Sequence, residues 1–120
     1  MTVGQAIDRA DFLCENAYDD RTKIAWLSTL DGMIHKNILE SSEPFEAYQS
    51  GDMQRELLAE PPFDEMYVNW LLCKIYFANQ EIEQYNNAAT VYGEMYQQYA
   101  RYHQRKTGTQ KKVRFTNYRE

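Results

Sequence analysis

The sequence contains few of the residues and motifs that mark catalytic or metal-binding proteins. Its two cysteines, Cys14 and Cys73, have no CxxC spacing and no nearby histidine, so they do not form a zinc-ligand pattern. No Gly-rich phosphate loop, HExxH motif or GxSxG motif occurs. The two histidines, His35 and His103, do not converge on a nucleophile or a metal cluster. We therefore expect a protein that is not an enzyme, with no catalytic residues, no metal and no cofactor.

Long hydrophobic runs are also missing. No apolar stretch approaches the roughly 18 residues that a membrane span needs, and the start MTVGQAIDRAD is polar and acidic, unlike a signal peptide. Cys14 and Cys73 fall in apolar helical patterns, which predicts two buried free thiols in a reducing compartment. The sequence therefore predicts an intracellular protein that does not bind a membrane.

Positive charge is scarce except at one end. Residues 1–100 hold six Lys and Arg against 17 Asp and Glu, a net charge of −11, whereas residues 101–120 hold seven basic residues and one Glu, a net charge of +6. An acidic body repels phosphate, so it is a poor general surface for nucleic acid. Only the basic end, which closes with KKVRFTNYRE, has the charge to bind phosphate.

Proline and glycine are few, with three and five copies, and the turn-forming residues gather in the middle of the chain. Residues 41–62 (SSEPFEAYQSGDMQRELLAEPP) contain all three prolines together with Ser-Ser and Ser-Gly pairs. We expect a long connection there, with a helical turn near residues 53–59. A long loop in a small domain is often functional.

Elsewhere apolar residues recur at helical spacing. Thr2 and Gln5 form a capping-box pattern at the start of the first helix, and Asp19 or Asp20 can cap the second. The third helix is apolar on most faces, which is typical of a helix buried on two sides. We predict four helices, over residues 3–15, 21–40, 63–80 and 81–106.

The sequence thus predicts an all-α fold, a small bundle of about four helices with the long 41–62 connection. A chain of 120 residues has room for one core, which we assign to residues 1–107. Gly108 is expected to end the helical region. Residues 108–120 then form an extended basic and aromatic tail, within which residues 111–115 alternate like a short strand.

Aromatic residues are plentiful, and ten of them are tyrosines. Tyr85, Tyr92, Tyr96, Tyr99 and His103 follow one another at steps of seven, four, three and four, so they share one face of the last helix. Tyrosine is enriched at protein interfaces, where surfaces are partly buried and partly wet. Two interpretations stay open: the stripe forms an interface, or it packs within the chain.

Two stretches, KIAWLSTLDGMI at residues 23–34 and PPFDEMYVNWLLCKIYFANQEIEQYNNAATVYGEMYQQYARY at residues 61–102, resemble a known family. The matching residues are Trp26, Leu27, Leu30, Asp31 and Gly32, then Pro62, Phe63, Asp64, Glu65 and Tyr67, then Lys74, Ile75, Asn79, Glu81, Tyr85, Asn86, Asn87, Tyr92, Tyr96 and Tyr99. In their order and spacing the chain is similar to the small head–tail connector (adaptor, or head-completion) proteins of long-tailed double-stranded DNA phages and prophages.

This resemblance implies a four-helix-type connector domain over residues 1–107, which assembles as a ring, usually dodecameric, beneath the portal of the virion neck. Assembly would take place in the cytoplasm of the bacterial host. Its partners would be copies of itself, the portal protein and the next neck or tail-completion protein. DNA would pass through the channel without sequence-specific binding, and no catalytic residue or cofactor is implied.

Two surfaces follow as hypotheses. Aromatic residues of the last two helices serve subunit contacts in the ring; they are Tyr67, Trp70, Tyr85, Tyr92, Tyr96 and Tyr99. The tail docks on the portal or a neighbouring subunit as a strand or clasp, drawn by the acidic bodies around it; its candidate residues are Lys111, Lys112, Val113, Arg114, Phe115 and Tyr118. The alternative function is a small helical DNA-binding or regulatory protein whose basic tail contacts phosphate.

Overall fold

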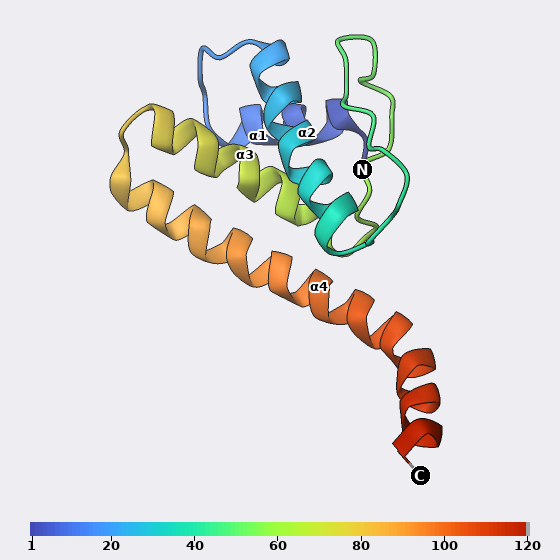
Figure 1. Cartoon of the computed structure of the whole chain (residues 1–120). Helices are drawn as coiled ribbons and strands as arrows, with labels where there is room; N and C mark the ends of the chain where they lie inside the picture. The colour runs from blue at the N-terminus through green and yellow to red at the C-terminus, as the bar shows by residue number, and fades with distance from the viewer. Residues whose placement is uncertain (120) are drawn as a thin grey trace.

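The computed structural model describes the backbone of residues 1–119 and the side chains of residues 1–107. Four helices confirm the predicted all-α fold: α1 (Val3–Leu13), α2 (Asp20–Asn37), α3 (Glu65–Ala78) and α4 (Ile82–Arg119) (Figure 1). Residues 1–119 contain no strand, only an isolated β-bridge between Thr2 and Glu56. Within this part of the chain, no helix combines the length and the apolarity that crossing a membrane requires.

The first two helices begin at the caps that the sequence predicts. The side chains of Thr2 and Gln5 each bind the other residue's backbone N–H, which completes the capping box of α1. Asp19 caps α2 by accepting a hydrogen bond from the Thr22 backbone N–H at 2.9 Å. The Thr22 hydroxyl also donates to Asp19, at 2.7 Å. The hydrogen bonds from the Thr22 side chain and backbone lower the pKa of Asp19. Helix α2 ends at Asn37, slightly earlier than predicted.

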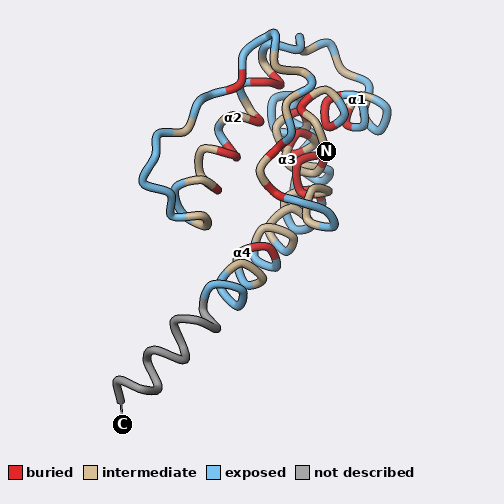
Figure 2. The backbone as a smooth tube through the Cα atoms, turned by 90° about the vertical axis from the view of Figure 1, so that its right-hand side faces the viewer, coloured by how far each residue is buried: buried red, intermediate tan, exposed pale blue. Residues whose placement is uncertain are grey.

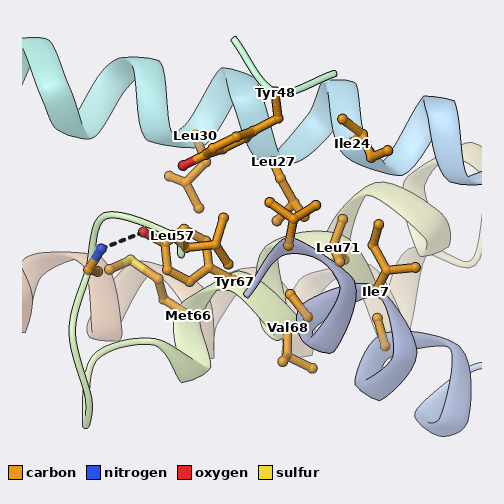
Figure 3. Packing of buried hydrophobic residues seen from close by; sticks show 14 of the residues in the cluster. Ile7, Ile24, Leu27, Leu30, Tyr48, Leu57, Met66, Tyr67, Val68 and Leu71 are labelled. Carbon is orange, nitrogen blue, oxygen red and sulfur yellow. Dashed lines mark hydrogen bonds between the residues drawn. The ribbon is translucent and has the colours of Figure 1, made fainter. Parts of the chain in front are cut away.

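The core lies around α3, which contacts each of the other three helices. This confirms that α3 is buried on more than one side, as its apolar sequence indicates. Tyr67, Leu71 and Ile75 of α3 are completely buried. Figure 3 shows the Tyr67 ring beside Leu57 and Met66, with residues of α1, α2 and the long connection closing around it.

The long connection from α2 to α3 is bound to the start of the chain. The backbone N–H groups of Val3 and Gly4 donate to the carbonyls of Arg55 and Met53, at 3.0 and 2.9 Å. The predicted helical turn at residues 53–59 does not form, because this backbone pairs across to α1 and its N-cap. The connection therefore covers one side of the core as an ordered layer (Figure 1).

Helix α4 packs along α3 and then continues past it (Figure 1). Its described residues change from partly buried beside α3 to mostly exposed towards residue 107 (Figure 2). The helix runs through Gly108 to Arg119, which corrects two expectations: that Gly108 ends the helix, and that residues 111–115 form a strand. A single glycine costs a helix only about 1 kcal/mol. Gln110, Lys111, Lys112 and Arg114 after it are good helix formers, so one glycine does not have to end the helix.

Candidate functional site

The tyrosine stripe of α4 faces the body of its own chain. Tyr85 packs on Phe77 and Tyr92 packs on Trp70, with ring centroids 5.4 and 5.1 Å apart. The Trp70 indole N–H donates to the Trp26 carbonyl at 2.7 Å, which fixes the ring that Tyr92 contacts. Tyr85, Tyr92, Tyr96 and Trp70 are each half-buried. Part of the surface of these four side chains stays exposed. That they contact a neighbouring subunit of the proposed ring therefore stays a prediction.

Two of the six candidate interface residues belong to the core instead. Tyr99 is 1 % exposed beneath Phe63, with ring centroids 5.3 Å apart, and burial raises its pKa to about 12. Tyr67 is completely buried. A neighbouring copy cannot reach either side chain in this conformation. The interpretation in which the stripe packs within the chain therefore holds for Tyr99, because the loop before α3 folds over that end of the stripe.

The Tyr67 hydroxyl belongs to a buried polar network around Asp31, whose side chain is 0 % exposed. Asp31 accepts hydrogen bonds from the hydroxyls of Tyr48 and Tyr67, at 2.5 and 2.6 Å, and from the Leu58 backbone N–H at 3.1 Å. The Tyr67 hydroxyl in turn accepts from the Ala59 N–H at 2.7 Å. The network therefore ties α2 and α3 to the connection between them.

Burial of Asp31 raises the pKa of its carboxyl, although the three donors around it favour the charged form. The pKa values of Tyr48 and Tyr67 are raised by burial and by the nearby carboxylate. All hydrogen bonds of Asp31 run to other parts of the fold. We infer a structural role for Asp31. The only signal of this role in the sequence is that an aspartate stands within the apolar stripe of α2.

The remaining reactive side chains are dispersed. His35 packs on Phe45 and His103 on Tyr99, with ring centroids 5.6 and 6.3 Å apart. Both cysteines are free; Cys73 is buried as predicted, but Cys14 is only half-buried, because α1 ends at Leu13. Among residues with described side chains, no group of three or more His, Cys, Asp or Glu could hold a metal ion.

A pocket of about 400 Å³ opens between α3 and the first half of α4. Its walls are the aromatic rings of Trp70, Phe77, Tyr85 and Tyr92, and Ala89 and Gly93 of α4 leave the space between them. A methyl group added at Gly93 would meet no atom within 4 Å. We call this feature the α3–α4 pocket. Of the candidate interface residues, Trp70, Tyr85 and Tyr92 therefore line a hollow.

Cys73 and Lys74 complete the lining of the α3–α4 pocket. Burial raises the pKa of the Cys73 thiol to about 11, so the thiol stays protonated and behaves as an apolar group. The Lys74 ammonium lies 4.5 Å from the centre of the Trp70 ring and forms no salt bridge with any residue in the described range 1–107. Lys74 is the single charged group of this apolar lining.

The last turn of α1 exposes a second apolar feature, which we call the α1 knob. Phe12 is 88 % exposed and Leu13 is 58 % exposed. Neither residue was predicted to be functional, because both lie off the buried stripe of that helix. The available signal was two large apolar residues adjacent in sequence and off the stripe. Adjacent exposed apolar side chains form a contiguous apolar surface, and it is contiguous apolar surface that marks interaction sites.

The surroundings of the α1 knob are acidic. Asp8 lies one turn before Phe12 and Glu15 follows shortly after it; both are exposed, and neither forms a salt bridge within residues 1–107. Arg9 is the nearby cation, and it is paired with Glu65 at the start of α3. The knob therefore carries local negative charge, opposite in sign to the Lys74 rim of the pocket.

The predicted docking tail lies outside the described side chains, which end at Thr107. Its six candidate residues, Lys111, Lys112, Val113, Arg114, Phe115 and Tyr118, are therefore known from the sequence alone. Comparisons of the chain with protein-family models, with curated proteins and with solved structures find no match.

Proposed function

We propose that this protein is a structural component of a phage virion neck, which forms a ring below the portal, joins the capsid to the tail and extends the DNA channel. The observation that carries the proposal is the apolar surface that one copy leaves uncovered. The α3–α4 pocket is open, and Phe77 and Ile82 beside the α3–α4 turn are 63 % and 59 % exposed. A protein whose work is assembly needs such surfaces.

The all-α fold and the sequence resemblance to head–tail connectors support the same proposal. A connector acts through contacts, so it uses neither a catalytic centre nor a cofactor. Its partners are further copies of itself, the portal protein and the next neck component. The net charge of −11 over residues 1–100 suits a wall past which DNA slides, since few cations are present to hold phosphate.

Electron microscopy of the purified protein, alone and mixed with the portal of the same phage or prophage, tests this function. We expect annular particles seated on one end of the portal, and the protein in purified virions. A protein that stays monomeric at high concentration, does not bind portal and is absent from virions would contradict the proposal. Tight binding to duplex DNA at physiological salt would favour the alternative, a regulator that contacts phosphate through residues 101–120.

The tail supplies a separate test of portal docking. Its basic charge is expected to be attracted to acidic partner surfaces and to set the register of docking. Deleting residues 108–120 should abolish attachment to the portal and leave the circular-dichroism spectrum helical. A matched control neutralises Lys111 and Lys112 with glutamine and keeps the length of the chain. Unchanged attachment of the deletion variant would remove the tail from the docking mechanism.

A further inference from the structure

We propose that the α1 knob of one copy inserts into the α3–α4 pocket of a second copy. This inference rests on the proposed function and names the contact that builds the ring. It commits the pocket to one occupant, the exposed Phe12–Leu13 end of α1 in an identical chain. Trp70, Phe77, Tyr85 and Tyr92 then act as the receiving side of the contact.

The two features fit each other chemically. The pocket of about 400 Å³ lies at the lower end of the size range of ligand pockets, and its walls are mainly aromatic rings. A phenylalanine ring entering it meets the faces and edges of other rings, an arrangement that stabilises aromatic pairs beyond the burial of area. Phe12 is 88 % exposed, so insertion removes nearly all of its side chain from water.

Charge complements this apolar fit. Lys74 is the one cation in the pocket lining, while Asp8 and Glu15 flank Phe12 with negative charge that forms no salt bridge within residues 1–107. Insertion of Phe12 would bring these opposite charges toward one another at the rim of the contact. Rim charges act mainly on orientation and association rate and are screened by salt. The attraction between Lys74 and these two acids therefore favours one orientation of the α1 knob in the pocket.

The contact joins two different surfaces of the same chain. Phe12 is exposed and the pocket is open in a single copy, so the two are not in contact within one chain. Each copy therefore carries one α1 knob and one α3–α4 pocket. A contact between the knob of one copy and the pocket of the next joins different surfaces, so it is heterologous. Repetition of a heterologous contact closes into a ring when the rotation between copies divides a full turn.

Two variants remove one side of the contact each. Phe12→Ser removes the knob at a position that makes little contact with the core. Gly93→Leu fills the pocket from a site with open space around it and replaces glycine in a helix with a better helix former. Each variant is expected to weaken self-association about 10- to 100-fold, the loss that corresponds to burying one large apolar side chain. Val91→Ser, at an exposed site outside the pocket lining, is the control and should change association less than about threefold.

Mixing the two variants tests the heterologous geometry. The Gly93→Leu copy keeps its knob and the Phe12→Ser copy keeps its pocket, so an equimolar mixture can form one contact and then no further one. At a concentration above the dissociation constant of the wild-type contact and below that of each variant, sedimentation should show each variant alone as a monomer and the mixture as a dimer that grows no larger. A mixture that behaves as the two separate variants do would overturn the proposal.

Photocrosslinking locates the contact directly, including when assembly requires the portal. Phe12→p-benzoylphenylalanine places a photoreactive ring at the knob, and a mixture of isotope-labelled and unlabelled chains separates links between copies from links within one. We expect links between position 12 and the α3–α4 pocket of another copy, in free protein at high concentration or in portal-bound rings. Links from position 12 only to other sites, only to the portal, or absent altogether would overturn the inference.

The outcomes distinguish this inference from the proposed function. If rings form on the portal but survive both Phe12→Ser and Gly93→Leu, the connector function stands and the knob-in-pocket contact fails. If Gly93→Leu blocks portal attachment while self-association is unchanged, the pocket holds a portal segment, which also overturns the inference. If the wild-type chain forms no assembly with itself or with portal, the proposed function fails as well.

Discussion

Replacing Asp31 with asparagine perturbs the fold while keeping the shape of its core. Oδ2 of Asp31 accepts from Tyr48 and from the Leu58 N–H, and Oδ1 accepts from Tyr67. An amide offers one oxygen in place of two, and its NH₂ group would face a hydroxyl that already donates. At least one buried hydroxyl proton of Tyr48 or Tyr67 therefore loses its acceptor in the Asp31→Asn variant.

The magnitude follows from the number of bonds lost. A hydrogen bond to a charged group contributes about 1.5–3 kcal/mol, and a buried donor without a partner costs about 1–3 kcal/mol. Removing the buried charge returns part of this loss, because burial already disfavours the ionised carboxyl of Asp31. We expect Asp31→Asn to lower the free energy of unfolding by about 2 kcal/mol. Asp31→Ala, which orphans all three donors, should cost about 3–5 kcal/mol.

Urea unfolding, monitored by circular dichroism, measures these losses. A double-mutant cycle with Tyr67→Phe isolates the interaction energy between Asp31 and Tyr67. The cycle should give a coupling energy of about 1–2 kcal/mol, since Asp31 and Tyr67 share one short hydrogen bond. An Asp31→Asn variant as stable as the wild type, with no coupling to Tyr67, would refute the structural role of the network.

The pH dependence of the same variant has a definite sign. The pKa of Asp31 is raised above its unfolded value of 3.8, so the folded chain binds the proton more tightly than the unfolded chain does. Stability from this group is then present below the unfolded pKa and is lost as the pH rises through the folded pKa. The cost of Asp31→Asn should therefore shrink as the pH rises across that window. A cost that grows with pH would show that the three donors outweigh burial.

Two further comparisons use matched positions. Gly93→Ala should stabilise the fold by up to about 1 kcal/mol, because its new methyl group meets open space. Gly4→Ala should destabilise the fold by about 1 kcal/mol, because its new methyl group would lie 3.1 Å from the Met53 carbonyl oxygen. Thermal unfolding of both variants checks this, and equal effects would contradict it. A thiol reagent near neutral pH should label half-buried Cys14 readily and Cys73 slowly, since burial raises the pKa of the Cys73 thiol to about 11; equal rates in native protein would contradict the burial of Cys73.

Local signals explain which parts of the fold the sequence could predict. The caps at Thr2 and Asp19 act within three residues, so their side-chain chemistry marks the helix starts directly. The path of the 41–62 connection could not be predicted in this way, because its partners are far away in sequence. The bridge between Thr2 and Glu56 joins segments more than 50 residues apart, and no periodicity reports such pairing.

The candidate site was predictable to a smaller extent, for a related reason. Helical spacing indicates which tyrosines share a face, but it does not indicate what covers that face. Tyr99 and Tyr92 lie on the same stripe, yet Phe63 buries the former while the latter lines an open pocket beside Trp70. Phe12 was missed because the prediction followed the buried stripe, and an exposed apolar side chain interrupts no pattern.

Several of the residues that carry the family resemblance serve the fold, whereas Lys74, Tyr85 and Tyr92 also line the α3–α4 pocket. Asp31 and Tyr67 bind each other in the core, and Trp26 supplies the carbonyl that holds Trp70. These contacts hold the fold together and do not by themselves require the chain to form a ring. The ring contact proposed above depends instead on Phe12, which is absent from the residues behind the resemblance, and on the open space beside Gly93. Variants at Phe12, which is exposed, and at Gly93, which has open space beside it, therefore test assembly separately from folding. Variants of core motif residues such as Asp31 would change both at once.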